Sequence, residues 1–237
     1  MKAFVFGSAA LFVAGAATTI ASPGAMPDVC GGPSMQGGTW GATSASFLAL
    51  WMPMTVAMMM PSLAPALWRY RQAIAATGGV GRPALTLAAG AGYFFVWALL
   101  GLAVQPLEVV LARGVPALVG GAVVLGAGLV QLGATKRRWL ARCRACAEGG
   151  ASLPARASTA WLHGMHLGVL CALSCANLMA AALVAGMMDP WILAAVTTAI
   201  TLERVARTRV AVAQATGIAL IGAGLLLMAR ATASSYT

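Results

Sequence analysis

The chain has 237 residues, of which 60% are hydrophobic and only 8% are charged. Soluble domains carry about 25% charged residues, so this composition excludes an ordinary water-soluble globular protein. The net charge of +10 does not indicate a nucleic-acid-binding protein, because the basic residues stand in short gaps between apolar runs rather than on one face interleaved with aromatic side chains.

Apolar runs recur along the chain at close to the ~20 residues that a helix needs to cross a bilayer. Backbone amides in lipid must find their partners within their own segment, so these runs are predicted to be helices. We therefore expect a single transmembrane domain over residues 1–237, an all-α polytopic bundle of about seven helices. The count falls to about six if the first span is cleaved or the sixth does not cross. The predicted spans are 3–21, 46–66, 84–104, 116–134, 160–186, 190–203 and 210–229.

The first run, 3–21, follows Lys2 and ends in small residues near Ala21, a pattern that also suits a signal peptide. The run is longer than a usual signal core, and we interpret it as a retained anchor. The following segment, 22–46, is rich in Gly, Pro and Ser and is predicted to be an irregular outer loop. Cys30 lies in this loop.

The second predicted span contains five methionines within residues 52–60. Met54 and Met58 share one face, because four residues advance about 40° beyond a full helical turn. Thioethers are soft ligands that suit monovalent copper. Methionine also fills irregular gaps beside prolines, and prolines stand at positions 53, 61 and 65, so this helix alone does not decide between a metal site and a core.

A longer cytoplasmic loop is predicted over residues 135–158, and it contains the motif Cys143-x-x-Cys146. His163 and His166 begin the next span on the same side of the membrane. Two thiolates and two imidazoles are a plausible metal-binding set. A C-x-x-C motif also suits thiol–disulfide chemistry, which leaves a redox role open.

The fifth predicted span carries Cys171, Cys175 and Met179 at intervals of four residues, which places them in one stripe. Neighbouring members lie about 6 Å apart along the axis and the outer two about 12 Å apart, so the stripe suits a series of soft sites better than a single cage. Free cysteine is also a small, commonly buried hydrophobe. Asn177 is harder to explain as core, because polar groups at membrane depth are costly and often functional.

Thirteen of the 15 Lys and Arg residues fall on one side if the N-terminus is cytoplasmic, and only Arg113 and Arg230 lie outside. This asymmetry follows the positive-inside rule. It predicts a multi-pass protein of the bacterial inner (cytoplasmic) membrane with its N-terminus inside and its C-terminus outside. Glu203, next to Arg204 at the end of the sixth span, is interpreted as half of an interfacial ion pair.

These residues resemble a bacterial family of predicted metal-binding integral membrane proteins, a domain of unknown function in which some members are labelled copper chaperones. The resemblance covers roughly residues 46 to 205. Three groups carry it, in the Met-Pro helix, around the C-x-x-C motif and in the cysteine-bearing helix with the segment after it: Trp51, Met54, Ala57, Met58, Met59, Pro61, Ser62 and Pro65; Gln131, Lys136, Leu140, Cys143 and Arg144; and Gly164, Gly168, Cys171, Cys175, Leu178, Met179, Gly186, Met187, Trp191 and Glu203.

The sequence departs from this family's pattern at two places. A Cys-Cys-Trp triplet is usual where this chain has Ser174, Cys175 and Ala176, and a lysine is usual where this chain has Arg204. The resemblance implies metal binding. The chain lacks one of the thiols of the usual triplet, so the metal affinity that the resemblance implies does not carry over directly.

From these features we predict a membrane protein that binds a soft metal, copper(I), and takes part in copper handling or delivery. The expected partners are the lipid bilayer and a membrane complex or copper-dependent enzyme, with no nucleic acid. One alternative is a non-catalytic membrane subunit or assembly factor, held through helix faces of small residues. Another is a thiol–disulfide redox protein. The candidate metal ligands are Met54, Met58, Cys171, Cys175, Met179, His163, His166, Cys143 and Cys146.

Overall fold

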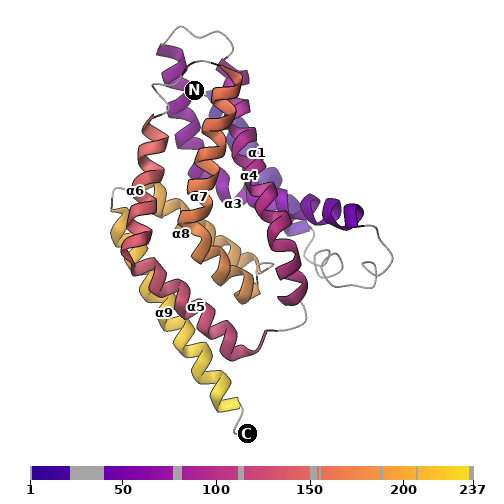
Figure 1. Cartoon of the computed structure of the whole chain (residues 1–237), viewed down its shortest axis with the longest axis vertical. Helices are drawn as coiled ribbons and strands as arrows, with labels where there is room; N and C mark the ends of the chain where they lie inside the picture. The colour runs from indigo at the N-terminus through magenta and orange to yellow at the C-terminus, as the bar shows by residue number, and fades with distance from the viewer. Residues whose placement is uncertain are drawn as a thin grey trace.

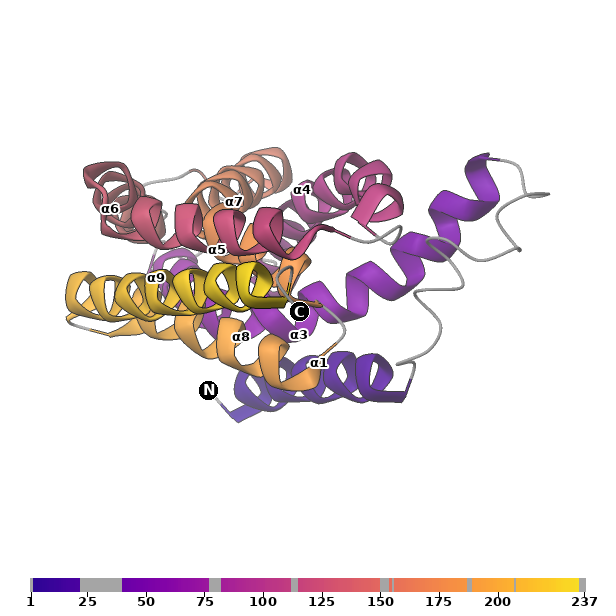
Figure 2. The same cartoon turned by 90° about the horizontal axis from the view of Figure 1, so that it is seen from below.

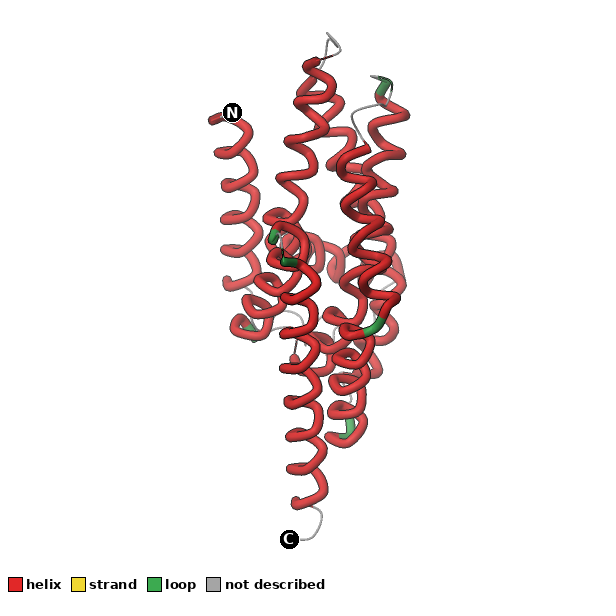
Figure 3. The backbone as a smooth tube through the Cα atoms, turned by 90° about the vertical axis from the view of Figure 1, so that its left-hand side faces the viewer, coloured by secondary structure: helices red, strands yellow, loops and turns green. Residues whose placement is uncertain are grey.

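The computed structural model describes residues 2–21, 40–76, 82–111, 115–149, 154, 156–186, 189–206 and 208–234. Figure 3 shows that these residues are almost entirely helical, with no strand among them. The predicted all-α class is confirmed. The helices are α1 (Lys2–Ala21), α3 (Trp40–Ala76), α4 (Arg82–Leu111), α5 (Ala117–Leu132), α6 (Ala134–Gly149), α7 (Ala157–Gly186), α8 (Pro190–Val205) and α9 (Arg209–Ser234).

Four of these helices, α3, α4, α7 and α9, are long and apolar enough to cross a membrane. The bent pair of α5 and α6 can be counted as a fifth span. Every predicted span overlaps a helix, but α8 has only 16 residues and is about 24 Å long, shorter than a hydrocarbon core of about 30 Å. The number of seven spans therefore stays a prediction.

Large apolar side chains cover the outside of the bundle. On α9, Ile218 is 65% exposed and Leu225 is 54% exposed, and on α4 Leu87 is 72% exposed. Continuous apolar surface of this kind is unfavourable in water and favourable against lipid. The outer surface thus agrees with the expectation from composition.

The predicted cytoplasmic loop over 135–158 is wrong for most of its length, because residues 134–149 form α6. This segment is rich in Ala and Arg, which favour helix, and has no proline. Gly133, in an extended conformation, separates α5 from α6, and the two helices meet at an angle of 63°. The C-x-x-C motif therefore lies on a helix. The predicted outer loop and Cys30 fall largely within 22–39, outside the described residues.

Close helix crossings hold the bundle together. Figures 1 and 2 both show α5 running beside α9. In the crossing of α4 with α7, a Cβ added at Gly164 would lie 1.9 Å from the carbonyl oxygen of Ala89, so only glycine fits there. The main core lies inside α3, α4 and α7 and includes the aromatic side chains of Phe47, Trp51 and Tyr93, each at most 2% exposed.

Candidate metal site

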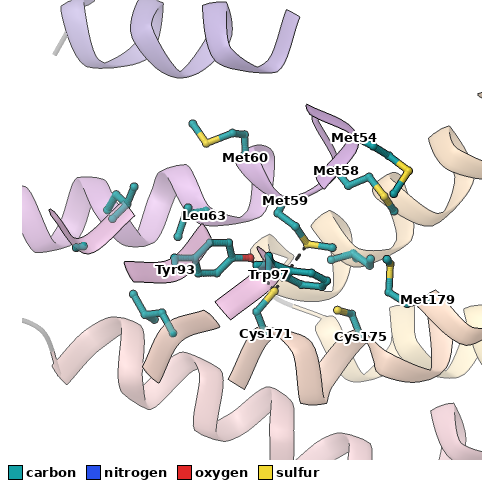
Figure 4. Close-up of a cluster of buried hydrophobic side chains, with 14 of the residues drawn as sticks. Met54, Met58, Met59, Met60, Leu63, Tyr93, Trp97, Cys171, Cys175 and Met179 are labelled. Atoms are coloured by element: carbon teal, nitrogen blue, oxygen red, sulfur yellow. Dashed lines mark hydrogen bonds between the residues drawn. The ribbon is translucent and has the colours of Figure 1, made fainter. Parts of the chain in front are cut away.

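Six sulfur-bearing side chains from α3 and α7 gather in this core, and we call them the sulfur cluster. Figure 4 shows their sulfur atoms turned toward a common interior region. None of the six side chains is more than 8% exposed. Helix α3 supplies three methionines and α7 supplies two cysteines and one methionine: Met54, Met58, Met59, Cys171, Cys175 and Met179.

Cys171 makes the closest contacts in the cluster. Its Sγ lies 3.8 Å from Sδ of Met59, across the interface between α7 and α3. The hydroxyl of Tyr93, from α4, donates a hydrogen bond to the same Sγ at 2.8 Å (Figure 4). Three helices thus meet at one fully buried thiol. A sulfur that accepts a hydrogen bond from a phenol is well placed to act as a thiolate ligand.

The five methionines of α3 do not all face this region. Met60 is buried, but its side chain points away from the two cysteines in Figure 4, and Met52 is only partly buried. Met59 lies against Cys171, although the sequence analysis did not choose it as a ligand. Helical geometry puts residues 58 and 59 about 100° apart, yet α3 is enclosed deeply enough that Met58 and Met59 are both fully buried.

Two tryptophans close one side of the cluster. The indole nitrogen of Trp51 donates a hydrogen bond to the backbone oxygen of Trp97 at 3.0 Å. Both rings line an apolar cavity of about 230 Å³, which Met179 also lines. The Met179 end of the predicted Cys-Cys-Met stripe therefore opens onto an apolar cavity.

A network of charged side chains lies against the turn of α7 that carries Ser174. Lys136 of α6 and Glu203 of α8 form an ion pair with N and O 2.7 Å apart, and each side chain is 2% exposed. Lys136 also donates to the backbone oxygen of Ser174. The interpretation of Glu203 as an interfacial partner of Arg204 is wrong, since its partner is Lys136 and the pair is buried. A buried pair needs such additional hydrogen bonds to offset its desolvation.

The network continues into α5 through side-chain amides. Gln131 donates to Glu203, and Asn177 donates to the side-chain oxygen of Gln131. Asn177 also donates to the backbone oxygen of Ala127 at 3.0 Å. The polar residue that the sequence analysis marked as unusual in mid-span therefore joins α7 to α5 and is satisfied by protein groups.

Two of the positions at which the chain departs from the family pattern, Ser174 and Arg204, contact each other. Arg204 donates to the hydroxyl of Ser174 at 2.7 Å. Ser174 lies between Cys171 and Cys175, so the guanidinium is held close to both thiols. A hydroxyl accepts a hydrogen bond from guanidinium well, so these two side chains are chemically compatible neighbours.

The second predicted ligand set is not brought together. Cys143 contacts the backbone oxygen of Leu170 at 3.1 Å, and Cys146 is half-buried on the same helix. His163 stacks on Tyr70 with ring centres 5.2 Å apart, whereas His166 is exposed. Among the described residues, no three His, Cys, Asp or Glu side chains lie close enough together to hold a metal ion.

Sequence reasoning missed Met59, Tyr93, Lys136 and the burial of Glu203. For Tyr93 no local signal exists, because its contact with Cys171 joins residues 78 positions apart. For Lys136 a signal exists: it is the first basic residue after an apolar run, at the start of Lys136-Arg137-Arg138, in a chain with only five acidic residues.

One family model matches residues 48–227, and its description reads PpoB2: Copper chaperone. The match covers most of the chain, and the chain belongs to this family. The resemblance drawn from the Met-Pro and cysteine motifs is thereby confirmed. No curated protein and no solved structure matches the chain.

Proposed function

Given this membership, we propose that the chain is a multi-pass protein of the bacterial inner membrane which binds copper(I) as cargo in its sulfur cluster and passes it to a partner. The contact between Cys171 and Met59 carries the proposal. Thiolate–metal bonds are about 2.3 Å long, so two sulfurs on one ion at a trigonal or tetrahedral angle stand about 3.8–4.0 Å apart. The two sulfurs are 3.8 Å apart.

The donor chemistry supports a soft monovalent ion. Thioethers and thiolates select copper(I) over harder ions, which prefer oxygen. Cys171 and Met59 would form the centre of the site, with Cys175, Met58 and Met179 as further ligands or as the next site along α7. Tyr93 would hold Cys171 in place and stabilise its charge between binding events.

The charge distribution and the termini support the proposed orientation. The start of α1 and the end of α9 lie toward opposite ends of the long axis (Figure 3). An odd number of crossings requires this arrangement, and the basic residues favour the N-terminus inside. The redox alternative keeps one supporting fact, that Cys143 and Cys146 are both free thiols one helical turn apart.

The test is copper(I) binding by purified protein kept under reducing conditions, in competition with a chromogenic copper(I) chelator. We expect Cys171→Ser to weaken binding by about tenfold or more, because it removes an anionic ligand at membrane depth. Met59→Leu should weaken binding less, because a thioether carries no charge. Met60→Leu is the matched control, since Met60 is equally buried but points away from the cysteines (Figure 4).

Cys175→Ser is expected to behave like Cys171→Ser if both thiols share one ion. Cys143→Ser should have a smaller effect, because the Cys143 side chain faces Leu170 and Arg204 rather than the sulfur cluster. If the parent binds no copper, or if Met59→Leu and Met60→Leu are indistinguishable from each other and from Cys171→Ser, the cysteines and methionines are ordinary core residues. The assembly-factor alternative would then replace this proposal.

A further inference from the structure

A second pocket lies beside the sulfur cluster, where α6, the end of α8 and the start of α9 come together on the left of Figure 1. Its volume is about 90 Å³, enough for several water molecules or one phosphate-sized group. Four helices each contribute one arginine to its lining: Arg69 from α3, Arg144 from α6, Arg204 from α8 and Arg209 from α9.

These four guanidinium groups have very little negative charge to balance them. Among the described residues, Arg69 and Arg209 make no ion pair, and Arg144 pairs only with the exposed Glu148. The one carboxylate in the lining, Glu203, is already paired with Lys136. The whole chain has 15 Lys and Arg but only five Asp and Glu, so the protein itself holds few counter-ions.

The arginines also repel one another. Arg144 is the like charge that acts most strongly on Arg209, and Arg69 adds to this repulsion, while the exposed Glu148 offsets part of it. Converging guanidinium groups are unfavourable unless an anion joins them, and their planar forks match the oxygens of phosphate with two parallel hydrogen bonds each. The pocket therefore has the charge, the donors and the size of an oxyanion site.

We propose that this pocket binds a phosphate group, supplied either by the headgroup of an anionic phospholipid or by free inorganic phosphate. Basic pockets between membrane helices on the cytoplasmic side commonly hold anionic headgroups. The lipid source has support from the surface beside the pocket: Val205, which lines it, is 55% exposed, and α9 continues outward from Arg209 with exposed apolar side chains along which acyl chains can lie. The proposal does not require copper binding, although Arg204 both lines this pocket and contacts Ser174 beside the two thiols.

The experiment is native mass spectrometry of the full chain in detergent, with phosphatidylglycerol, phosphatidylcholine or inorganic phosphate added. The test variant is R69Q/R209Q, which removes two pocket arginines. The matched control is R137Q/R138Q, which removes the same charge from exposed positions of α6 that do not line the pocket. R69K/R209K keeps the positive charges but loses the planar, forked guanidinium groups. It is the test variant if R69Q/R209Q does not fold.

We expect the parent to bind phosphatidylglycerol in preference to phosphatidylcholine, with affinity at least about tenfold weaker in R69Q/R209Q and little changed in R137Q/R138Q. R69K/R209K should lie between the parent and R69Q/R209Q. If only inorganic phosphate shows this pattern, the pocket is an oxyanion site whose ligand is free phosphate rather than a lipid headgroup. If neither probe binds the parent, or both glutamine variants lose binding equally, the pocket is no oxyanion site.

Discussion

Replacement of Lys136 by methionine should be among the most destabilising single changes in the described bundle. The substitution keeps the length of the side chain but leaves Glu203 as a buried carboxylate without its cation. With N and O 2.7 Å apart, the gross attraction at an effective dielectric constant of 20 is about 6 kcal/mol. Desolvation offsets part of this, and removal of one partner from such a pair typically costs about 3–5 kcal/mol.

The assay is thermal unfolding of purified K136M in detergent, followed by tryptophan fluorescence. The double variant K136M/E203Q removes the orphaned charge and should recover much of the lost stability. The chain offers a matched control in the ion pair of Arg144 and Glu148, whose side chains are 58% and 51% exposed. E148Q should change stability little, because solvent screens exposed pairs. Equal shifts for K136M and E148Q, or no recovery in the double variant, would refute the reasoning.

Two further predictions concern packing and topology. Gly164→Ala should destabilise the protein by about 1–3 kcal/mol, because the added Cβ would lie 1.9 Å from the backbone of Ala89; Gly126→Ala, where a Cβ meets nothing within 4 Å, is the control in the same unfolding assay and should not destabilise. A reporter active only in the periplasm, fused at the C-terminus, should be active, and activity of a cytoplasmic reporter there would instead favour an even number of crossings.

Sequence alone predicted the helices well, because long apolar runs leave the backbone few alternatives in lipid. It failed at α6, where the charged residues that mark a cytoplasmic segment are also good helix formers. The charge of a segment indicates on which side of a membrane it lies, but not whether its backbone is helical. The helix propensity of the proline-free stretch 134–149 is the sequence signal that indicates α6.

The site was predicted in outline and missed in detail. Residues on one helix, such as Cys171 and Cys175, are related by a fixed period, so their common face follows from the sequence. Met59 and Tyr93 join the site through contacts between helices, which depend on how deeply α3 is enclosed and on the crossing of α4 with α7. No local pattern contains that information. The one long-range clue was the shortage of acidic residues, which makes any buried lysine a candidate partner for Glu203.

The charges around the sulfur cluster explain why the proposed cargo is monovalent. Two thiolates and one copper(I) ion leave a net charge of −1, which needs one nearby cation at membrane depth. Lys136 is neutralised by Glu203. Among the described residues at this turn, the remaining cation is Arg204, which donates a hydrogen bond to Ser174 and whose charge acts on Cys171. A divalent ion on the same thiolates would make the site neutral and leave Arg204 without a partner. The arrangement therefore favours the copper(I) complex, because two thiolates, one copper(I) ion and the Arg204 guanidinium together carry no net charge.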